Sequence, residues 1–159
     1  MVNTANTIHC VIVPIESTNI LLPNTVVAEV IRFTEPEPVK GSPEWLLGHI
    51  TWQAWRVPVI DYACLIGLEI DENPQGTRIM VVKSLLQGEQ LPYIGLVASG
   101  LPKLVTVSAG MLIEDPKLEL TTGLFSEVTV NNKQAMIPDI DHLTRLAAQE
   151  TFGSRKARA

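Results

Sequence analysis

The segment that most constrains the fold covers residues 48–61, Gly-His-Ile-Thr-Trp-Gln-Ala-Trp-Arg-Val-Pro-Val-Ile-Asp. It predicts two β-strands joined by a tight turn at Gln53-Ala54. Pro58 lies inside the second strand and favours an edge strand or a bulge there, because proline lacks a backbone donor. An edge strand offers free backbone donors and acceptors to another chain. The segment therefore indicates a protein that works by being bound, and nothing in it is typical of a catalytic centre.

Two tryptophans flank the predicted turn. Trp52 continues the alternation from Gly48 and Ile50, so we expect its side chain to pack inward. Trp55 stands next to Arg56 and is expected to be more exposed. Tryptophan and arginine are favoured anchors of protein interfaces, although ordinary packing inside a barrel is an alternative for both tryptophans.

Composition restricts the classes of partner. The chain has 159 residues, enough for one domain or two small subdomains. Hydrophobic residues make up 46% and charged residues 18%, so a packed core is expected and extensive disorder is not. The net charge of −5 argues against nucleic acid or an anionic membrane as the main partner, since both select a basic face. The basic cluster Arg155-Lys156-Arg158 is interpreted as a solvated, frayed C-terminus.

The two cysteines indicate a reducing compartment. Cys10 and Cys64 stand 54 positions apart, form no CxxC or zinc-type spacing, and lie in apolar runs where a free thiol behaves as a small hydrophobe. The N-terminus lacks the charged and apolar regions of a signal peptide. No apolar run reaches the roughly 18 residues of a membrane span. We therefore expect a cytoplasmic protein without direct membrane insertion.

Short β-rich runs recur along the rest of the chain, separated by Gly, Pro and Asn turns. We expect strands over residues 8–15, 20–22, 28–33, 78–85, 91–98, 101–107, 124–130 and 134–138, and a helical turn over 62–67. We expect loops over residues 34–43 and 69–76, and irregular chain over 108–122. Ile140, Leu143, Leu146 and Ala147 recur at helical spacing, which predicts one clear helix over residues 139–149. This pattern favours an all-β sandwich or barrel closed by a helix.

Motifs for nucleotide binding and nucleophilic catalysis are absent from the sequence, which has no Gly-x-Gly-x-x-Gly, P-loop or Gly-x-Ser-x-Gly. His9, His49 and His142 share no ligand spacing. His9 and Cys10 are adjacent, but neighbours on a strand point to opposite faces. A buried thiol beside an exposed imidazole is therefore favoured over a catalytic pair. Asp61 leaves an apolar strand and is interpreted as a turn former or helix cap rather than a base.

The acidic stretches are interpreted as solvated loops. Glu69, Asp71 and Glu72 lack the spacing of a calcium loop, and the same holds for Glu114-Asp115. We therefore expect no catalytic residue, no metal site and no cofactor.

Five landmarks follow one another in an order that is similar to a known family. They are Val27-Ala28-Glu29-Val30-Ile31, the proline-rich residues 35–43, the hairpin at 48–61, Gly95-Leu96-Val97 leading into residues 100–105, and Ile137-Pro138-Asp139-Ile140-Asp141-His142-Leu143. Over about residues 8–150 they resemble the CheW-like adaptor family of bacterial chemosensory systems. No single landmark is decisive, but the five in order are specific.

The resemblance implies a fold of two small, packed, five-stranded β-barrels with a C-terminal helix. It implies one domain over residues 8–150, with flexible tails at 1–7 and 151–159. The implied function is a non-enzymatic adaptor that couples the cytoplasmic tip of a methyl-accepting chemoreceptor to the regulatory domain of a CheA-type histidine kinase. The positions that match the family's partner-binding surface are Val27, Glu29, Gly48, Gln53 and Leu104, and Trp55 joins them through its expected exposure.

Departures from the family pattern leave the pathway open. The usual Arg-Gly of the hairpin turn is Gln53-Ala54 here, which removes a charge and a forked donor, and alanine resists the positive φ that glycine accepts. A usual aspartate is replaced by Ser99. The variants Ala28-Glu29-Val30 and Trp52-x-x-x-Arg56-Val57-Pro58-Val59 resemble the accessory, ChpC-like members of type IV pilus (twitching-motility) chemosensory systems. The alternative is a divergent β-barrel domain that homo-oligomerises or binds a small ligand.

Overall fold

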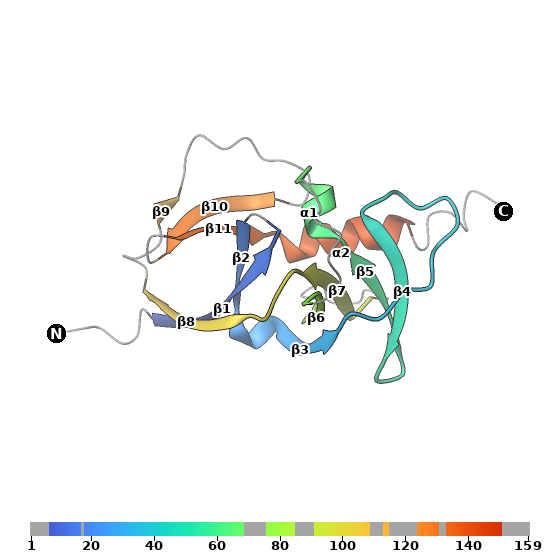
Figure 1. The fold of residues 1–159 in the computed structure, drawn as a ribbon, viewed down its shortest axis with the longest axis horizontal. Coiled ribbons are helices and arrows are strands. Elements are labelled where there is room, and N and C mark those ends of the chain that lie inside the picture. The colour runs from blue at the N-terminus through green and yellow to red at the C-terminus, as the bar shows by residue number, and fades with distance from the viewer. Residues whose placement is uncertain are drawn as a thin grey trace.

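Two β-sheets and a C-terminal helix form the described part of the chain (Figure 1). The computed structural model describes residues 7–16, 18–68, 76–84, 91–108, 113–114, 124–130 and 133–150. The predicted β-rich fold of two sheets with a C-terminal helix is confirmed. Most of the expected tails, the acidic loop at 69–75 and the cluster at Arg155-Lys156-Arg158 lie outside the described residues. Thr7, which we placed in the N-terminal tail, already belongs to the first strand.

The first sheet contains six strands. Their order is β8(Lys103–Ser108), β1(Thr7–Ile15), β2(Thr18–Pro23), β11(Lys133–Pro138), β10(Leu124–Val130) and β9(Ile113–Glu114). All neighbours are antiparallel except β11 and β2, which pair in parallel. The sixth strand, the two-residue β9, lies in the stretch that the sequence left irregular. Since β8 ends the sheet on one side, one of its backbone edges faces away from the ladder.

The second sheet contains five strands, and it corrects the prediction for Pro58. Their order is β3(Val27–Arg32), β6(Arg78–Lys83), β7(Tyr93–Ala98), β5(Trp55–Ile60) and β4(Leu46–Trp52). Of the two alternatives expected for Pro58, the edge strand is wrong, because β5 lies between β4 and β7. A register irregularity does lie beside Pro58, between Leu46 and Gly48 opposite Ile60 and Val59. Its parallel pairing with β7 involves only Val59 and Ile60. The missing proline donor therefore falls just outside that ladder.

A strap from the proline-rich segment closes part of the second sheet. Glu37 pairs with His49 of β4 through two backbone hydrogen bonds, with N–O distances of 2.8 and 2.9 Å. Gly48 makes this approach possible: its φ is +138°, and a Cβ there would overlap the carbonyl oxygen of Glu37. The segment that we expected to be only a loop therefore runs along an edge strand, with Pro36 buried. The sheet curls into an open barrel rather than a closed one.

Three hydrophobic clusters fill the space within and between the sheets. The largest lies between them and includes Val13, Ile20, Met80 and Leu96. Helix α2(Ile140–Ala148) packs Ile140, Leu143 and Ala147 of its apolar stripe into this cluster, as predicted from their spacing. Its ribbon runs from the end of β11 toward the second sheet in Figure 1. The other two clusters occupy the concave faces of the first and second sheets.

Two aspartates begin helices as side-chain caps. Asp139 precedes α2 and accepts a hydrogen bond from the backbone N–H of His142 at 3.1 Å. Asp61 precedes the short helix α1(Tyr62–Leu65) and accepts from the backbone N–H of Cys64 at 3.2 Å. The interpretation of Asp61 as a helix cap is confirmed. Residues between β2 and β3 form a 3-10 helix, η2(Asn24–Val26).

Candidate functional site

The tip of the β4–β5 hairpin is a two-residue turn built without glycine. Gln53 has a φ of +46° and Ala54 a φ of +65°, which is the pattern of a type I′ turn. This turn matches the twist of the flanking strands, and Trp52 and Trp55 therefore face each other directly across it. The turn keeps its tight geometry, but Ala54 holds a backbone conformation that costs about 1 kcal/mol relative to glycine.

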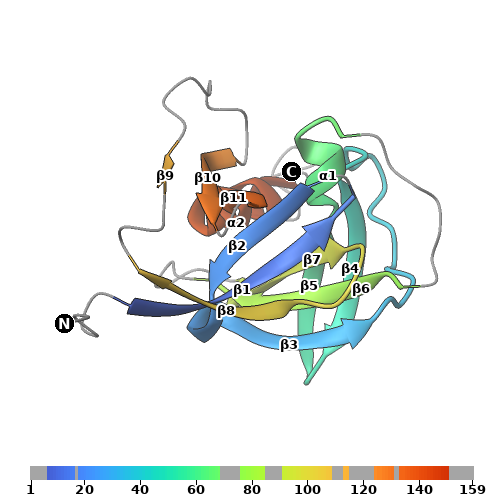
Figure 2. The ribbon, with the colours of Figure 1, turned by 60° about the vertical axis from the view of Figure 1, so that its left-hand side comes forward.

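Trp52 connects the two edges of the second sheet. Its side chain is 8% exposed, which confirms the predicted inward packing. Its indole Nε1 donates a hydrogen bond to Glu29 Oε2 at 2.6 Å. Glu29 belongs to β3 and Trp52 to β4, the two outermost strands of this sheet, and both figures show β3 passing beside the hairpin (Figure 1; Figure 2). The bond therefore bridges the gap of the open barrel and fixes the direction of the carboxylate.

Tyr93 supports both tryptophans. Its ring centroid lies 4.9 Å from that of Trp52 in an edge-to-face arrangement and 6.0 Å from that of Trp55. Trp55 itself is 48% exposed, which confirms the predicted exposure. We name the group Glu29, Trp52, Trp55 and Tyr93 the barrel mouth. Tyr93 was not among the predicted site residues, because nothing near it in the sequence marks the pairing that brings β7 to the hairpin.

The residues of the barrel mouth lie on one face of the sheet. Glu29 stands opposite Val81 in the β3–β6 ladder, and Val81 shares the concave cluster with Trp52. Directly opposed residues of an antiparallel pair point to the same side. The Glu29 carboxylate and the three rings therefore all stand at the concave side of the sheet, at the end where β3, β5 and β7 begin.

The remaining predicted positions separate into different places. Leu104 lies on the other sheet, in edge strand β8, and is 75% exposed. Val27 opens β3 half-buried and packs against the large cluster between the sheets. Gly48 is buried beneath the Glu37 strap, so it reaches a partner only through the shape of the backbone. Of the six predicted positions, the structure brings Glu29, Gln53 and Trp55 together, and Leu104 marks a second surface.

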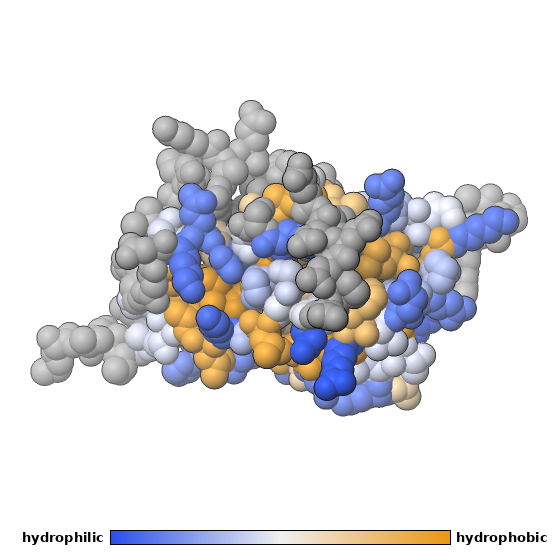
Figure 3. All heavy atoms as spheres, viewed as in Figure 1, coloured by the Kyte–Doolittle hydropathy of each residue, from blue (hydrophilic) through white to orange (hydrophobic). Residues whose placement is uncertain are grey.

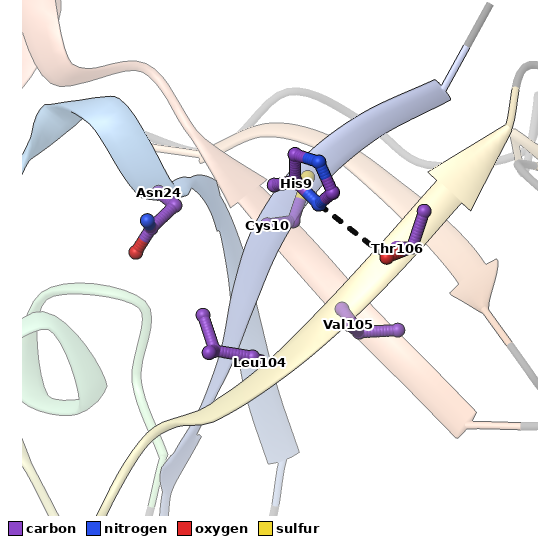
Figure 4. A pocket seen from close by; sticks show the side chains of 6 residues that line it. All are labelled: His9, Cys10, Asn24, Leu104, Val105 and Thr106. Carbon is purple, nitrogen blue, oxygen red and sulfur yellow. Dashed lines mark hydrogen bonds between the residues drawn. The ribbon is translucent and has the colours of Figure 1, made fainter. Parts of the chain in front are cut away.

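A shallow hollow accompanies Leu104. It has a volume of about 250 Å³ and lies between β1, β8 and η2 (Figure 4). Its lining residues are His9, Cys10, Asn24, Leu104, Val105 and Thr106. Hydrophobic side chains gather over β1 and β8 on the face seen in Figure 3. Ile8 of β1 is also exposed. We name the exposed side of Leu104 and this hollow the β8 surface.

The hollow carries no activated nucleophile. His9 Nδ1 lies 3.4 Å from Thr106 Oγ1, on the exposed side of the strands. Cys10 is 5% exposed, and burial raises the pKa of its thiol, which favours the unreactive protonated form. The expectation of a buried thiol beside an exposed imidazole is confirmed. Burial also raises the pKa of the Asp61 carboxyl, which acts as the cap of α1.

Among the described residues, no three His, Cys, Asp or Glu side chains are grouped so that they could hold a metal ion. In the described part of the chain no helix is long and apolar enough to cross a bilayer.

A solved scaffolding protein and one protein family are similar to this chain. The crystal structure of the scaffolding protein TtCheW from Thermoanaerobacter tengcongensis aligns with a TM-score of 0.71, over 83% of this chain and 88% of that chain, at 18% identity. At so low an identity, this structural alignment shows a shared fold and nothing more. No curated protein matches the chain. The family model of the CheW-like domain matches residues 9–148, so this chain belongs to the CheW-like family, as the five sequence landmarks predicted.

Proposed function

We propose that this chain is a non-enzymatic cytoplasmic adaptor that couples a chemoreceptor tip to the regulatory domain of a CheA-type histidine kinase. The CheW-like family is one of scaffolding adaptors, which supports a coupling role in chemotaxis. One observation carries the proposal for this chain. Two large hydrophobic side chains, Trp55 and Leu104, are 48% and 75% exposed on different sheets. Exposed apolar anchors of this kind are typical of protein interfaces.

The two surfaces suit a protein that bridges two partners. The barrel mouth belongs to the second sheet and the β8 surface to the first, so one partner does not need to displace the other. One exposed hydrophobic side chain and the residues around it give only a modest affinity for a partner. In a receptor array, several such contacts form at once and raise the overall affinity. We assign one partner to each surface and propose that Glu29 and Gln53 contribute directly to the first of them. Gly48 would act on it through the path of the β4 backbone, and Val27 through the packing of β3.

The variants Ala28-Glu29-Val30 and Trp52-x-x-x-Arg56-Val57-Pro58-Val59 favour an accessory, ChpC-like member of a type IV pilus system. The hairpin turn and Ser99 argue against the usual receptor contact of a principal adaptor. The turn presents Gln53 in place of the family's usual arginine, so the charge at the tip is lost. Ser99 accepts a hydrogen bond from the backbone N–H of Glu16 at 3.0 Å and so helps to join the two sheets. A residue engaged in this way acts in the fold rather than as a charged contact.

Calorimetry with purified partners tests the proposal. The titrants are the regulatory domain of the CheA-type kinase and the cytoplasmic tip of a chemoreceptor from the same cell. We expect saturable micromolar binding of both, with Leu104→Ser weakening one partner and Trp55→Ala weakening the other.

Lys40→Gln changes an exposed loop residue and is expected to bind both partners like the wild type. The proposal fails if the folded wild type binds neither partner. It also fails if light scattering shows a stable homo-oligomer that both surface variants break, since the surfaces would then join copies of this chain.

A further inference from the structure

The barrel mouth combines one carboxylate with three aromatic rings. Its residues come from four different strands, and three contacts link them in a chain from Glu29 through Trp52 and Tyr93 to Trp55. Trp52 is buried, Tyr93 is half-buried, and Glu29 and Trp55 are exposed. The polar end and the outer ring of the group therefore both face solvent.

The carboxylate of Glu29 can accept a hydrogen bond from a second donor. Oxygen Oε2 accepts the indole N–H at 2.6 Å, which is the length of a strong, charge-assisted bond. Within the described residues the Glu29 carboxylate forms no other hydrogen bond or ion pair. An ionised carboxylate has about four acceptor positions, so most of them remain open on the exposed side.

The exposed ring of Trp55 suits a cation. The face of an indole carries negative potential and attracts a guanidinium or ammonium group within about 6 Å of its centre. Arginine fits better than lysine, because its planar fork stacks on a ring and donates parallel hydrogen bonds to a carboxylate. The hairpin places Trp55 directly opposite Trp52, whose indole bonds to Glu29.

We propose that the barrel mouth binds an arginine side chain presented by the partner protein. The ring of Trp55 stacks on the guanidinium, Glu29 accepts its hydrogen bonds, and Trp52 and Tyr93 hold these two in place. This inference rests on the proposed function for the identity of that partner as a receptor or kinase. It specifies that the partner contributes an arginine side chain to the contact.

Two cations of the chain itself lie nearby. Lys83 is exposed and stands directly opposite Tyr93 in the β6–β7 ladder, so it shares the rim of the mouth. Arg56 follows Trp55 and points to the other face of the hairpin, where it pairs in register with Thr51. Lys83 therefore competes with an incoming arginine, and its removal strengthens binding.

A small probe tests the site without a partner protein. N-acetyl-arginine amide is titrated at low salt while the indole N–H signals of the full chain are followed by NMR. The neutral isostere N-acetyl-citrulline amide is the matched control ligand. We expect a saturable shift of the Trp55 and Trp52 signals with arginine and at most a tenth of that shift with citrulline at equal concentration.

Variants locate the binding. Trp55→Leu keeps an apolar side chain without the π face and is expected to weaken arginine binding about threefold to fivefold, and Glu29→Gln about fivefold or more. Lys83→Gln is expected to strengthen it about twofold. Glu44→Gln removes an equal charge just before β4, whose other end carries Trp52, and is expected to change nothing.

The outcomes separate this inference from the proposed function. Equal shifts with arginine and citrulline, or arginine binding that survives in Trp55→Leu and Glu29→Gln, overturn the arginine site. If the wild type binds kinase and receptor but not the probe, the adaptor function stands and the arginine site fails. Selective binding of the probe by a chain that binds neither protein supports the site and refutes the adaptor function.

Discussion

Replacing Gly48 with alanine measures how much the Glu37 strap contributes to the second sheet. The added Cβ would lie within 2.6 Å of the carbonyl carbon of Glu37, which is closer than any real contact. The strap must then move away from β4 and lose its two backbone hydrogen bonds to His49. Those bonds are worth about 0.5–1.5 kcal/mol each, and the φ of +138° adds about 1–3 kcal/mol for a residue with a Cβ.

The summed effect is a loss of about 2–6 kcal/mol in the free energy of unfolding. For a chain of this size it lowers the melting temperature by roughly 4–24 °C. Gly41→Ala is the matched control, because Gly41 has a φ of +79° but nothing within 4 Å of an added Cβ. That variant carries the backbone cost alone, about 1–2 kcal/mol.

Urea unfolding followed by tryptophan fluorescence gives both free energies under the same conditions. The difference between the two variants reports the steric overlap and the lost strap. A Gly48→Ala variant within about 0.5 kcal/mol of Gly41→Ala would refute the reasoning, since the strap would then be shown to add nothing. In that case Gly48 would matter for a partner in some other way than through the shape of β4.

Three further predictions concern the turn, the pH dependence and the thiols. Ala54→Gly is expected to stabilise the chain by about 0.5–1 kcal/mol in thermal unfolding, because glycine accepts the positive φ, whereas Ala28→Gly in β3 is expected to destabilise it. Burial, aided by the nearby Arg56 and opposed by Glu37, lowers the pKa of His49 below 6.5, so the neutral ring is favoured in the folded state. The stability that this effect contributes is complete above about pH 6.5 and is lost as the pH falls through the lowered pKa. Between pH 7.5 and pH 5 the urea midpoint of unfolding should therefore fall more for the wild type than for His49→Gln. Burial raises the pKa of both cysteine thiols, so alkylation at pH 7 is expected to be slow in the folded chain and fast in urea, and equal rates would contradict this.

Local patterns in the sequence predicted most elements of the fold. The hairpin, the inward Trp52, the outward Trp55 and the helix stripe follow from alternation and spacing within a few residues, and the structure has all of them. The position of Pro58 depended on a distant segment instead. Val59 pairs with Gly95 in another part of the chain, and no local feature shows that β5 has neighbours on both sides.

The candidate site was predictable in part for the same reason. Glu29 and Trp55 were predicted from landmarks and from chemistry, but the hydrogen bond that joins Glu29 to Trp52 spans 23 positions. Tyr93 contacts both tryptophans from a strand that begins almost 40 residues after the hairpin turn. Gly48 was predicted as a contact and is found as the point where the Glu37 strap crosses β4. Its role in binding a partner stays a prediction.

The bond between Glu29 and Trp52 determines how a substitution at the contact surface must be interpreted. Glu29→Arg reverses a charge, but it also removes the acceptor that joins β3 to β4 across the open barrel. A loss of binding in that variant therefore has two causes, one chemical and one geometric. Glu29→Gln keeps an acceptor oxygen and removes only the charge, whereas Trp52→Phe keeps the charge and a ring against Tyr93 and removes only the donor. If the surface acts through its charge, Glu29→Gln loses more affinity than Trp52→Phe; if it acts through the closure of the barrel, the order is reversed.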